Sequence, residues 1–212
     1  MTTINPPEMP TPQQSQTLLV EGNQRFREGK STWVGKAWNR TDMSPTNQKP
    51  FAVVLGCSDS RTPVEILFDQ GFGDLFVVRI AGNVVAPSVI GSVEFAVSKF
   101  GSRLVVVMGH TQCGAVSATI EAIETGAGPG SKNLQSITDR IAPHIEELVR
   151  NGQPGKIWRS GVRANVRASA DHLRHGSVML EKLVESGQVA IVGAEYELET
   201  GIVHFFENPQ GA

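Results

Sequence analysis

Two short motifs in this chain carry side chains that could bind a metal ion. The first, "CSDSR", runs from Cys57 to Arg61, and the second, "HTQC", runs from His110 to Cys113. Two thiolates and one imidazole form a ligand set that suits Zn²⁺. Structural zinc sites use four protein ligands, whereas three ligands and one open position are typical of catalytic sites. Because the sequence has no third cysteine, the pattern favours the catalytic arrangement.

Asp59 is the candidate to fill or guard the open position. Its carboxylate could ligate zinc, or it could accept a hydrogen bond from hydroxide on the metal. Arg61 lies on the same turn and could hold Asp59 through a bidentate pair. Zinc with two thiolates and a neutral imidazole carries no net charge, so its bound water is harder to deprotonate than on a three-histidine site. A cationic neighbour such as Arg61 would help to lower the pKa of the bound water again.

Each of these residues also has a plainer interpretation. The two cysteines could be small apolar core residues, Asp59 and Ser60 are common in turns, and His110 could be a packing residue. A cysteine-phosphatase loop would need the spacing C-x5-R, whereas the sequence has C-x3-R. The joint placement of the two motifs is what favours a metal site.

Each motif begins at the last residue of an apolar run, "FAVVLGC" or "SRLVVVMGH", and these runs predict buried strands at 51–57 and 102–110. Further strands are predicted at 73–83, 189–197 and 202–206, and helices at 88–101, 113–126, 133–152 and 161–187. Alternating strands and helices indicate an α/β fold with a mainly parallel central sheet flanked by helices. Ligands of such sheets bind at the carboxyl ends of the strands. The two motifs would therefore meet at one edge.

The N-terminal part has a different character. Residues 1–14 are polar and rich in proline, which predicts a flexible arm. Residues 15–30 predict an amphipathic helix that Ser15 could cap. With little core of its own, the segment 15–50 is interpreted as a helical dimerisation arm that packs on another subunit. The α/β zinc catalytic domain then spans 51–212.

Composition narrows the class of protein. The chain has 212 residues, 40% of them hydrophobic, and a net charge of −2, which favours a globular protein and disfavours nucleic acid as a partner. The N-terminal residues lack the pattern of a signal peptide. No apolar stretch reaches the roughly 18 residues that span a membrane. We therefore expect a cytoplasmic protein without a membrane partner.

The paired motifs resemble those of the β-carbonic anhydrases, in which C-x-D-x-R follows one strand and H-x-x-C follows a later one. The resemblance covers about residues 15–206, including the closing "GAEYELETGIVHFF". It implies one zinc ion per subunit, bound by Cys57, His110 and Cys113. It also implies reversible hydration of carbon dioxide to bicarbonate and a proton by zinc-bound hydroxide. Such proteins are dimers, often doubled to tetramers, whose N-terminal helices wrap the partner.

The same resemblance implies roles for residues around the metal. Asp59 would accept the hydroxide proton, and Arg61 would orient Asp59. Gln48 looks like the amide that donates a hydrogen bond to the substrate oxygen, and Gly114 would add a backbone N–H. The family also has a closed state in which the carboxylate, here Asp59, ligates zinc.

Two pockets are implied as well. Phe76 and Ala81 look like the apolar wall for carbon dioxide, and Ala81 leaves more room than the valine frequent in the family. Some members bind bicarbonate beside the site, in a pocket that uses a tryptophan three residues before the first cysteine. Here that residue is Val54, although Arg79 and Glu65 stand at other positions of that pocket. The departure at Val54 argues against bicarbonate regulation.

Two other functions remain open at this point. An enzyme on the same scaffold could hydrolyse carbonyl sulfide or carbon disulfide, with an unchanged zinc site and a different pocket shape. Alternatively, the chain could be a non-catalytic zinc-binding protein with Asp59 locked on the metal. The intact pair of Asp59 and Arg61, together with Gln48, weighs against the second alternative.

Overall fold

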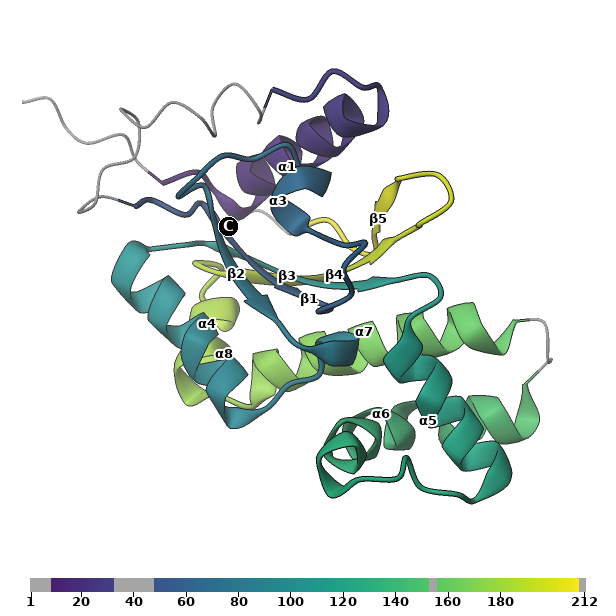
Figure 1. Cartoon of the computed structure of the whole chain (residues 1–212). Helices are drawn as coiled ribbons and strands as arrows, with labels where there is room; N and C mark the ends of the chain where they lie inside the picture. Colours follow the sequence, from purple (N-terminus) through teal and green to yellow (C-terminus); the bar gives the residue numbers. More distant parts are fainter. Residues whose placement is uncertain (1–8, 33–47, 153–155, 210–212) are drawn as a thin grey trace, which may run out of the picture.

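A computed structural model describes residues 9–32, 48–152 and 156–209. In this part of the chain, a five-stranded sheet of order β2-β1-β3-β4-β5 lies between two layers of helices (Figure 1). This arrangement confirms the predicted α/β fold with a mainly parallel sheet. None of the helices in the described part is long and apolar enough to cross a membrane.

The central strands are the most deeply buried part of the sheet. The strands are β1 (Ala52–Gly56), β2 (Leu75–Arg79), β3 (Leu104–His110), β4 (Ala190–Tyr196) and β5 (Val203–Phe205). The first four are parallel, and β5 pairs antiparallel with β4. Every residue of β1 and β3 is buried, as their continuous apolar runs predict for strands covered on both faces.

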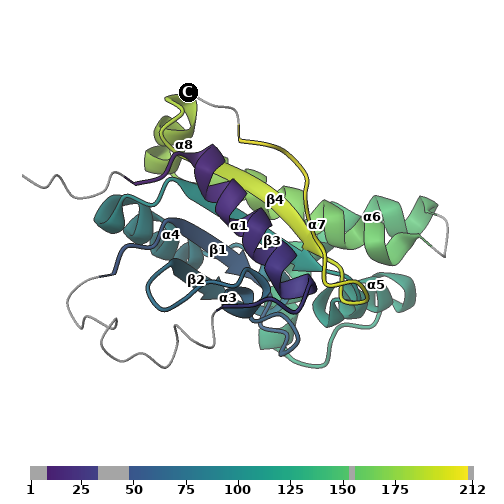
Figure 2. The same cartoon turned by 90° about the horizontal axis from the view of Figure 1, so that it is seen from above.

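Helices cover both faces of the sheet (Figures 1 and 2). On one face lie α4 (Pro87–Phe100), α5 (Gly114–Thr125), α6 (Lys132–Asn151), α7 (Ile157–His175) and α8 (Val178–Glu185), and on the other lie α1 (Pro12–Arg27) and α3 (Val64–Leu67). The single helical segment predicted at 161–187 is two helices. The first helix, α7, ends before its C-cap residue Gly176. The Ser177 hydroxyl then caps α8 by accepting the N–H of Leu180 at 3.2 Å.

The N-terminal helix begins earlier than predicted. Thr11 caps α1, because its hydroxyl accepts the N–H of Gln14 at 3.2 Å while the Gln14 side chain accepts the N–H of Thr11 at 2.8 Å. This reciprocal capping box starts the helix at Pro12. The prediction that Ser15 caps the helix is therefore wrong. Ser15 is buried inside it, and its hydroxyl donates to the Phe51 carbonyl at 3.3 Å.

The same helix has a core contact of its own. Leu19 is fully buried in the apolar cluster that α1 shares with α3, β1 and β3, and Figure 2 shows α1 running across the sheet. Asn23 adds a buried hydrogen bond from its amide to the Leu67 carbonyl at 3.1 Å. The expectation that this segment lacks a core is therefore wrong for α1. Its role in dimerisation stays a prediction, and residues 1–8 and 33–47 lie outside the described residues.

Candidate metal centre

Three potential metal ligands meet at the carboxyl edge of the sheet. Cys57 follows β1, His110 ends β3, and Cys113 immediately precedes α5. Because β1 and β3 are parallel neighbours, their carboxyl ends lie side by side. All three side chains are buried, and their donor atoms lie within 4.8 Å of one another. The structure thus brings together the residues of the two sequence motifs in a group that could hold a metal ion.

The imidazole of His110 is oriented toward the thiols by the backbone. Its Nδ1 lies 2.9 Å from the carbonyl oxygen of Thr111. Because a carbonyl only accepts, Nδ1 must carry the proton, and Nε2 then offers a lone pair. Nε2 is buried and has no hydrogen-bond partner among the described residues. A buried nitrogen without a partner is costly, and a bound metal ion would satisfy it.

Cys57 is favoured as a thiolate. Its sulfur accepts a hydrogen bond from the N–H of Gly82 at 3.3 Å. Gly82 has φ +66°, and a Cβ there would lie 2.9 Å from the Cβ of Ala115, so only glycine fits without displacement. In the metal-free protein the hydrogen bond from Cys113, supported by the one from the N–H of Gly82, lowers the pKa of Cys57 to about 4. That bond to Cys57 and burial together raise the pKa of Cys113.

Asp59 is held beside these ligands as an anion. Arg61 donates from Nε to Oδ1 at 2.9 Å and from Nη2 to Oδ2 at 2.7 Å, and its backbone N–H also donates to Oδ1 at 2.9 Å. The side-chain hydrogen bond from Arg61 holds the pKa of Asp59 well below its usual range. Oδ2 lies 3.8 Å from Nε2 of His110. A carboxylate of fixed orientation therefore borders the group of potential ligands.

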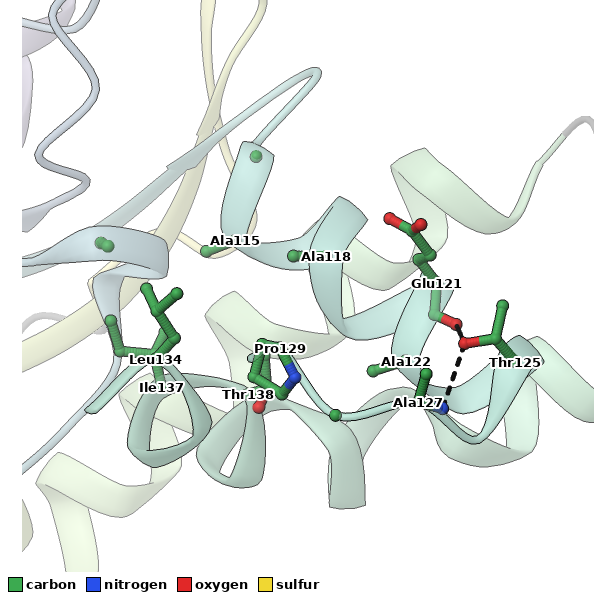
Figure 3. Close-up of a pocket in the computed structure, with 13 residues that line it drawn as sticks. Ala115, Ala118, Glu121, Ala122, Thr125, Ala127, Pro129, Leu134, Ile137 and Thr138 are labelled. Atoms are coloured by element: carbon green, nitrogen blue, oxygen red, sulfur yellow. Dashed lines mark hydrogen bonds between the residues drawn. The ribbon is translucent and has the colours of Figure 1, made fainter. Parts of the chain in front are cut away.

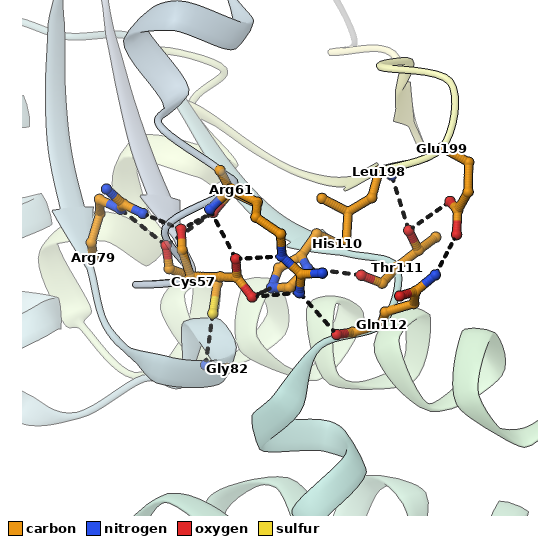
Figure 4. Close-up of polar contacts among 11 residues, drawn as sticks. Cys57, Arg61, Arg79, Gly82, His110, Thr111, Gln112, Leu198 and Glu199 are labelled. Atoms are coloured by element: carbon orange, nitrogen blue, oxygen red, sulfur yellow. Dashed lines mark hydrogen bonds and ion pairs between the residues drawn. The ribbon is translucent and has the colours of Figure 1, made fainter.

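Arg79 supports the backbone of the Cys57–Arg61 turn. It donates from Nε to the Cys57 carbonyl at 3.0 Å and from Nη2 to the Asp59 carbonyl at 2.6 Å (Figure 4). The sequence reasoning did not find this role. The relevant signal is the register that pairs Arg79 with Gly56, the last residue of β1, and this register follows only from the strand order. Val54 is fully buried in the middle of β1.

Ala81 and Gly114 lie at the same edge. Ala81 opens the short turn η2 (Ala81–Asn83) after β2, and Gly114 is the first residue of α5. Both line a cavity of about 470 Å³ (Figure 3). Its other lining residues are Ala115, Ala118, Glu121, Ala122, Thr125, Ala127, Gly128, Pro129, Leu134, Ile137 and Thr138. The cavity is thus mainly apolar where it adjoins these two positions.

Gln48 and Phe76 lie toward the opposite end of the sheet. Gln48 is exposed, precedes β1 and lies beside Gly73. Eight residues, five of them in β1, separate it from Cys57, and the strand alone spans about 16 Å. Phe76 is the second residue of β2 and packs against Phe95 with ring centroids 6.2 Å apart. Within one chain, the structure does not bring Gln48 or Phe76 to the group of potential ligands.

Comparisons of sequence agree with this arrangement. A sequence model of the family described as carbonic anhydrase matches residues 52–203. "Carbonic anhydrase 2" of Mycobacterium tuberculosis is 38% identical over 183 residues, which cover 86% of this chain and 87% of the relative. A carbonic anhydrase of Mycolicibacterium smegmatis is 39% identical over 185 residues, which cover 87% and 88%. The similarity therefore spans nearly the whole of each protein.

Solved structures share the fold. A β-carbonic anhydrase of Aspergillus fumigatus superposes with a TM-score of 0.69 at 24% identity, covering 90% of this chain and 92% of that one. The Coccomyxa β-carbonic anhydrase, solved with acetazolamide, gives a TM-score of 0.69 at 22% identity, covering 89% and 84%. One of two tetrameric β-carbonic anhydrases of Sordaria macrospora superposes with a TM-score of 0.65 at 22% identity, covering 76% of this chain and 82% of that one.

Proposed function

We propose that this chain, which belongs to the β-carbonic anhydrase family, hydrates carbon dioxide reversibly to bicarbonate and a proton at a zinc ion. The observation that carries the proposal is the meeting of three buried donor atoms beside an ionised carboxylate. Cys57, His110 and Cys113 would hold the ion, and Asp59 would face the remaining position.

The donor set fits zinc in particular. Two sulfur atoms and one imidazole nitrogen are ligands that Zn²⁺ prefers, whereas Ca²⁺ and Mg²⁺ require oxygen. Nε2 of His110 is the ring nitrogen left for a metal ion, because Nδ1 is engaged by the Thr111 carbonyl and Nε2 has no hydrogen-bond partner among the described residues. Zinc bound here would supply the activation of water for attack on carbon dioxide.

The protein's own groups would orient the reaction. Asp59, kept ionised by Arg61, accepts a hydrogen bond from the attacking oxygen nucleophile and so directs its lone pair toward carbon. The N–H of Gly114 belongs to the free N-terminal amides of α5 and stabilises the negative charge that develops on the substrate oxygen. If Asp59 moved onto zinc instead, it would give up two charge-assisted hydrogen bonds to Arg61. This cost favours the open, catalytic form over a locked one.

Gln48 and Phe76 would serve the site of a second copy of the chain. Both lie near the amino end of the edge strand β2 and its neighbour β1, too far from Cys57 in the same subunit. Aromatic surface lies at this end of the molecule, since Phe72 is 65% and Phe95 is 52% exposed. Such surface favours association between subunits, and a structural relative is tetrameric. We therefore propose a dimer or tetramer in which each subunit completes the pocket of another.

A second candidate activity is hydrolysis of carbonyl sulfide or carbon disulfide. The observation in its favour is the apolar cavity beside Ala81 and Gly114, because a roomy apolar wall would admit a larger sulfur-containing substrate. The metal site would be the same in both cases, so only the pocket decides between the two activities.

Stopped-flow hydration of carbon dioxide at alkaline pH tests the main proposal. Zinc-loaded protein should accelerate hydration, a chelator should abolish the acceleration, and added zinc should restore it. Absence of any metal-dependent rate would refute the proposal and favour a non-catalytic zinc protein. Parallel assays with carbonyl sulfide and carbon disulfide would establish whether either replaces carbon dioxide as the better substrate.

A further inference from the structure

We propose that Glu199, an exposed residue between β4 and β5, is a positioning residue for the metal site. It would act through the two-residue turn Thr111–Gln112, which joins His110 to Cys113. The inference rests on the proposed zinc function. The loop between β4 and β5 would keep His110 and Cys113 at the spacing that zinc binding requires.

The contacts run from this loop directly to the turn (Figure 4). Glu199 accepts from the Thr111 hydroxyl at 3.1 Å through one oxygen and from the Gln112 amide at 2.6 Å through the other. The N–H of Leu198 donates to the same Thr111 hydroxyl at 3.0 Å. The Thr111 N–H donates to the Tyr196 carbonyl at 2.9 Å. The connection after β4 therefore grips both residues of the turn.

The turn needs such support because its backbone is unusual. Gln112 has φ +56°, a conformation that residues other than glycine adopt rarely and at a free-energy cost. A residue keeps this conformation only when its surroundings impose it. The amide of Gln112 is tied to Glu199, so the carboxylate helps to impose the conformation. Relaxation of this turn would change the distance between His110 and Cys113.

The turn also carries two contacts that reach the chemistry. The Thr111 carbonyl accepts the Nδ1 proton of His110 at 2.9 Å and thereby fixes which nitrogen faces the metal. The Gln112 carbonyl accepts from Nη2 of Arg61 at 3.4 Å, and that same guanidinium orients Asp59. A shift of the turn would therefore disturb the orientation of His110 and, through Arg61, that of Asp59.

The contacts of Glu199 do not support a role elsewhere in the described part of the chain. Among the ion pairs of residues 9–32, 48–152 and 156–209, none includes Glu199. In that part of the chain, its side-chain hydrogen bonds to other residues all go to the turn. Glu197, two residues earlier, contacts Thr200 and Arg159 instead, which makes it a matched control on the same loop.

The test compares Glu199→Ala, Thr111→Val and the double variant with Glu197→Gln and the unmodified protein. Zinc release to an excess of chelator is measured beside kcat and KM for carbon dioxide. We expect Glu199→Ala to release zinc about tenfold faster and to lose about tenfold in kcat with little change in KM, because outer-shell partners of metal ligands have effects of this size. Glu199→Gln, which keeps one acceptor, should fall between, and Glu197→Gln should stay near the unmodified protein.

The double variant separates positioning from general loop stability. If Glu199 acts through Thr111, the double variant should be no worse than the more impaired single variant. Fully additive losses, or zinc release by Glu199→Ala at the unmodified rate, would overturn the inference. Should Glu199→Ala fail to fold, Glu199→Gln and Thr111→Val carry the same comparison. An unmodified protein that binds zinc but lacks activity would refute the proposed function, while the zinc-release rates would still decide the role of Glu199.

Discussion

Arg61 holds both carboxylate oxygens of Asp59, with Nε 2.9 Å from Oδ1 and Nη2 2.7 Å from Oδ2. This fork fixes the orientation of the carboxylate, and its side-chain hydrogen bonds keep the carboxylate ionised. Because Arg61 also reaches the carbonyl of Gln112, the pair links the two motifs across β1 and β3. The orientation of Asp59 therefore depends on both strand ends.

Replacing Asp59 by asparagine should separate catalysis from metal binding. Asparagine is nearly isosteric, but its amide cannot offer two anionic acceptors, so the guide for the nucleophile is lost while the three ligands remain. We expect Asp59→Asn to retain zinc and to lose about 10²- to 10⁴-fold in kcat, the usual range for a group that handles a proton. Zinc content by elemental analysis and stopped-flow hydration check both parts.

The control for that experiment is Glu21→Gln, which removes an exposed carboxylate from α1 and should leave the rate unchanged. Loss of zinc in Asp59→Asn would show that Asp59 is a ligand in the resting protein. Full activity in that variant would contradict the role proposed for the Asp59–Arg61 pair.

Removal of the metal should leave one thiolate in the site at neutral pH. The pKa of Cys57 is lowered to about 4 from 9.0, first by the hydrogen bond from Cys113, whose own pKa is raised. Thiolate absorbance near 240 nm in metal-free protein should therefore correspond to one thiolate at pH 7 and should decline only as the pH approaches 4. Cys57→Ser should abolish this low titration and should also fail to retain zinc.

The shifted pKa values of Cys57 and His110 also make the folding stability of the metal-free protein depend on pH, in opposite directions. Since the folded pKa of Cys57 lies below 9.0, its contribution to stability is complete above pH 9 and is lost as the pH falls toward 4. For His110, burial opposes protonation, but the neighbouring Cys57 thiolate outweighs burial and raises the pKa. That contribution is complete below pH 6.5 and is lost as the pH rises through the raised value. The two contributions change in opposite directions with pH, so thiolate absorbance tests Cys57 better than a measurement of unfolding free energy does.

An absorbance that corresponds to two thiolates at pH 7, or to none, would contradict the prediction of a single thiolate on Cys57.

The shape of the cavity predicts which substrates the pocket accepts. Ala81→Val adds two methyl groups at the wall shared with Gly114. We expect kcat/KM for carbonyl sulfide to fall about tenfold further than kcat/KM for carbon dioxide, because a tight apolar pocket discriminates by at least roughly tenfold between substrates that differ in size by about one methylene group. Ala127→Val lies at the end of the cavity far from Ala115 (Figure 3) and serves as the matched control. Equal losses for both substrates would show that Ala81 does not set the size of the pocket.

The sequence was sufficient to predict the group of potential metal ligands because Cys57 and His110 stand at the ends of continuous apolar runs, which place both at the ends of buried strands. Sequence spacing did not show which end of the sheet Gln48 occupies. Gln48 is only nine positions before Cys57, but a strand extends the chain between them. The contacts of Glu199 with the Thr111–Gln112 turn and of Arg79 with the Cys57–Arg61 turn were not predicted, because they depend on strand order and register. At the helix start, Thr11 and Gln14 already had capping-box spacing, which Ser15 lacks.

The placement of Gln48 predicts complementation between two impaired variants. Asp59→Asn abolishes the site of its own subunit, whereas Gln48→Ala should impair the site of the partner, because Gln48 lies at the far end of β1. In a mixed oligomer, a subunit with an intact Asp59 then receives an intact Gln48 from its Asp59→Asn partner. We therefore expect co-expressed variants to be more active than either variant alone.

The size of this recovery follows from counting sites. In a mixed dimer, one of the two sites has both intact residues and the other has neither, so activity should approach half that of the unmodified dimer. Tags of different sequence on the two variants allow the mixed oligomer to be isolated before stopped-flow measurement. If Gln48 acted within its own subunit, every site of the mixed dimer would carry one substitution, and the rate would only equal the mean of the two variants. That outcome would place Gln48 outside a shared pocket, and the intersubunit assignment would have to be abandoned.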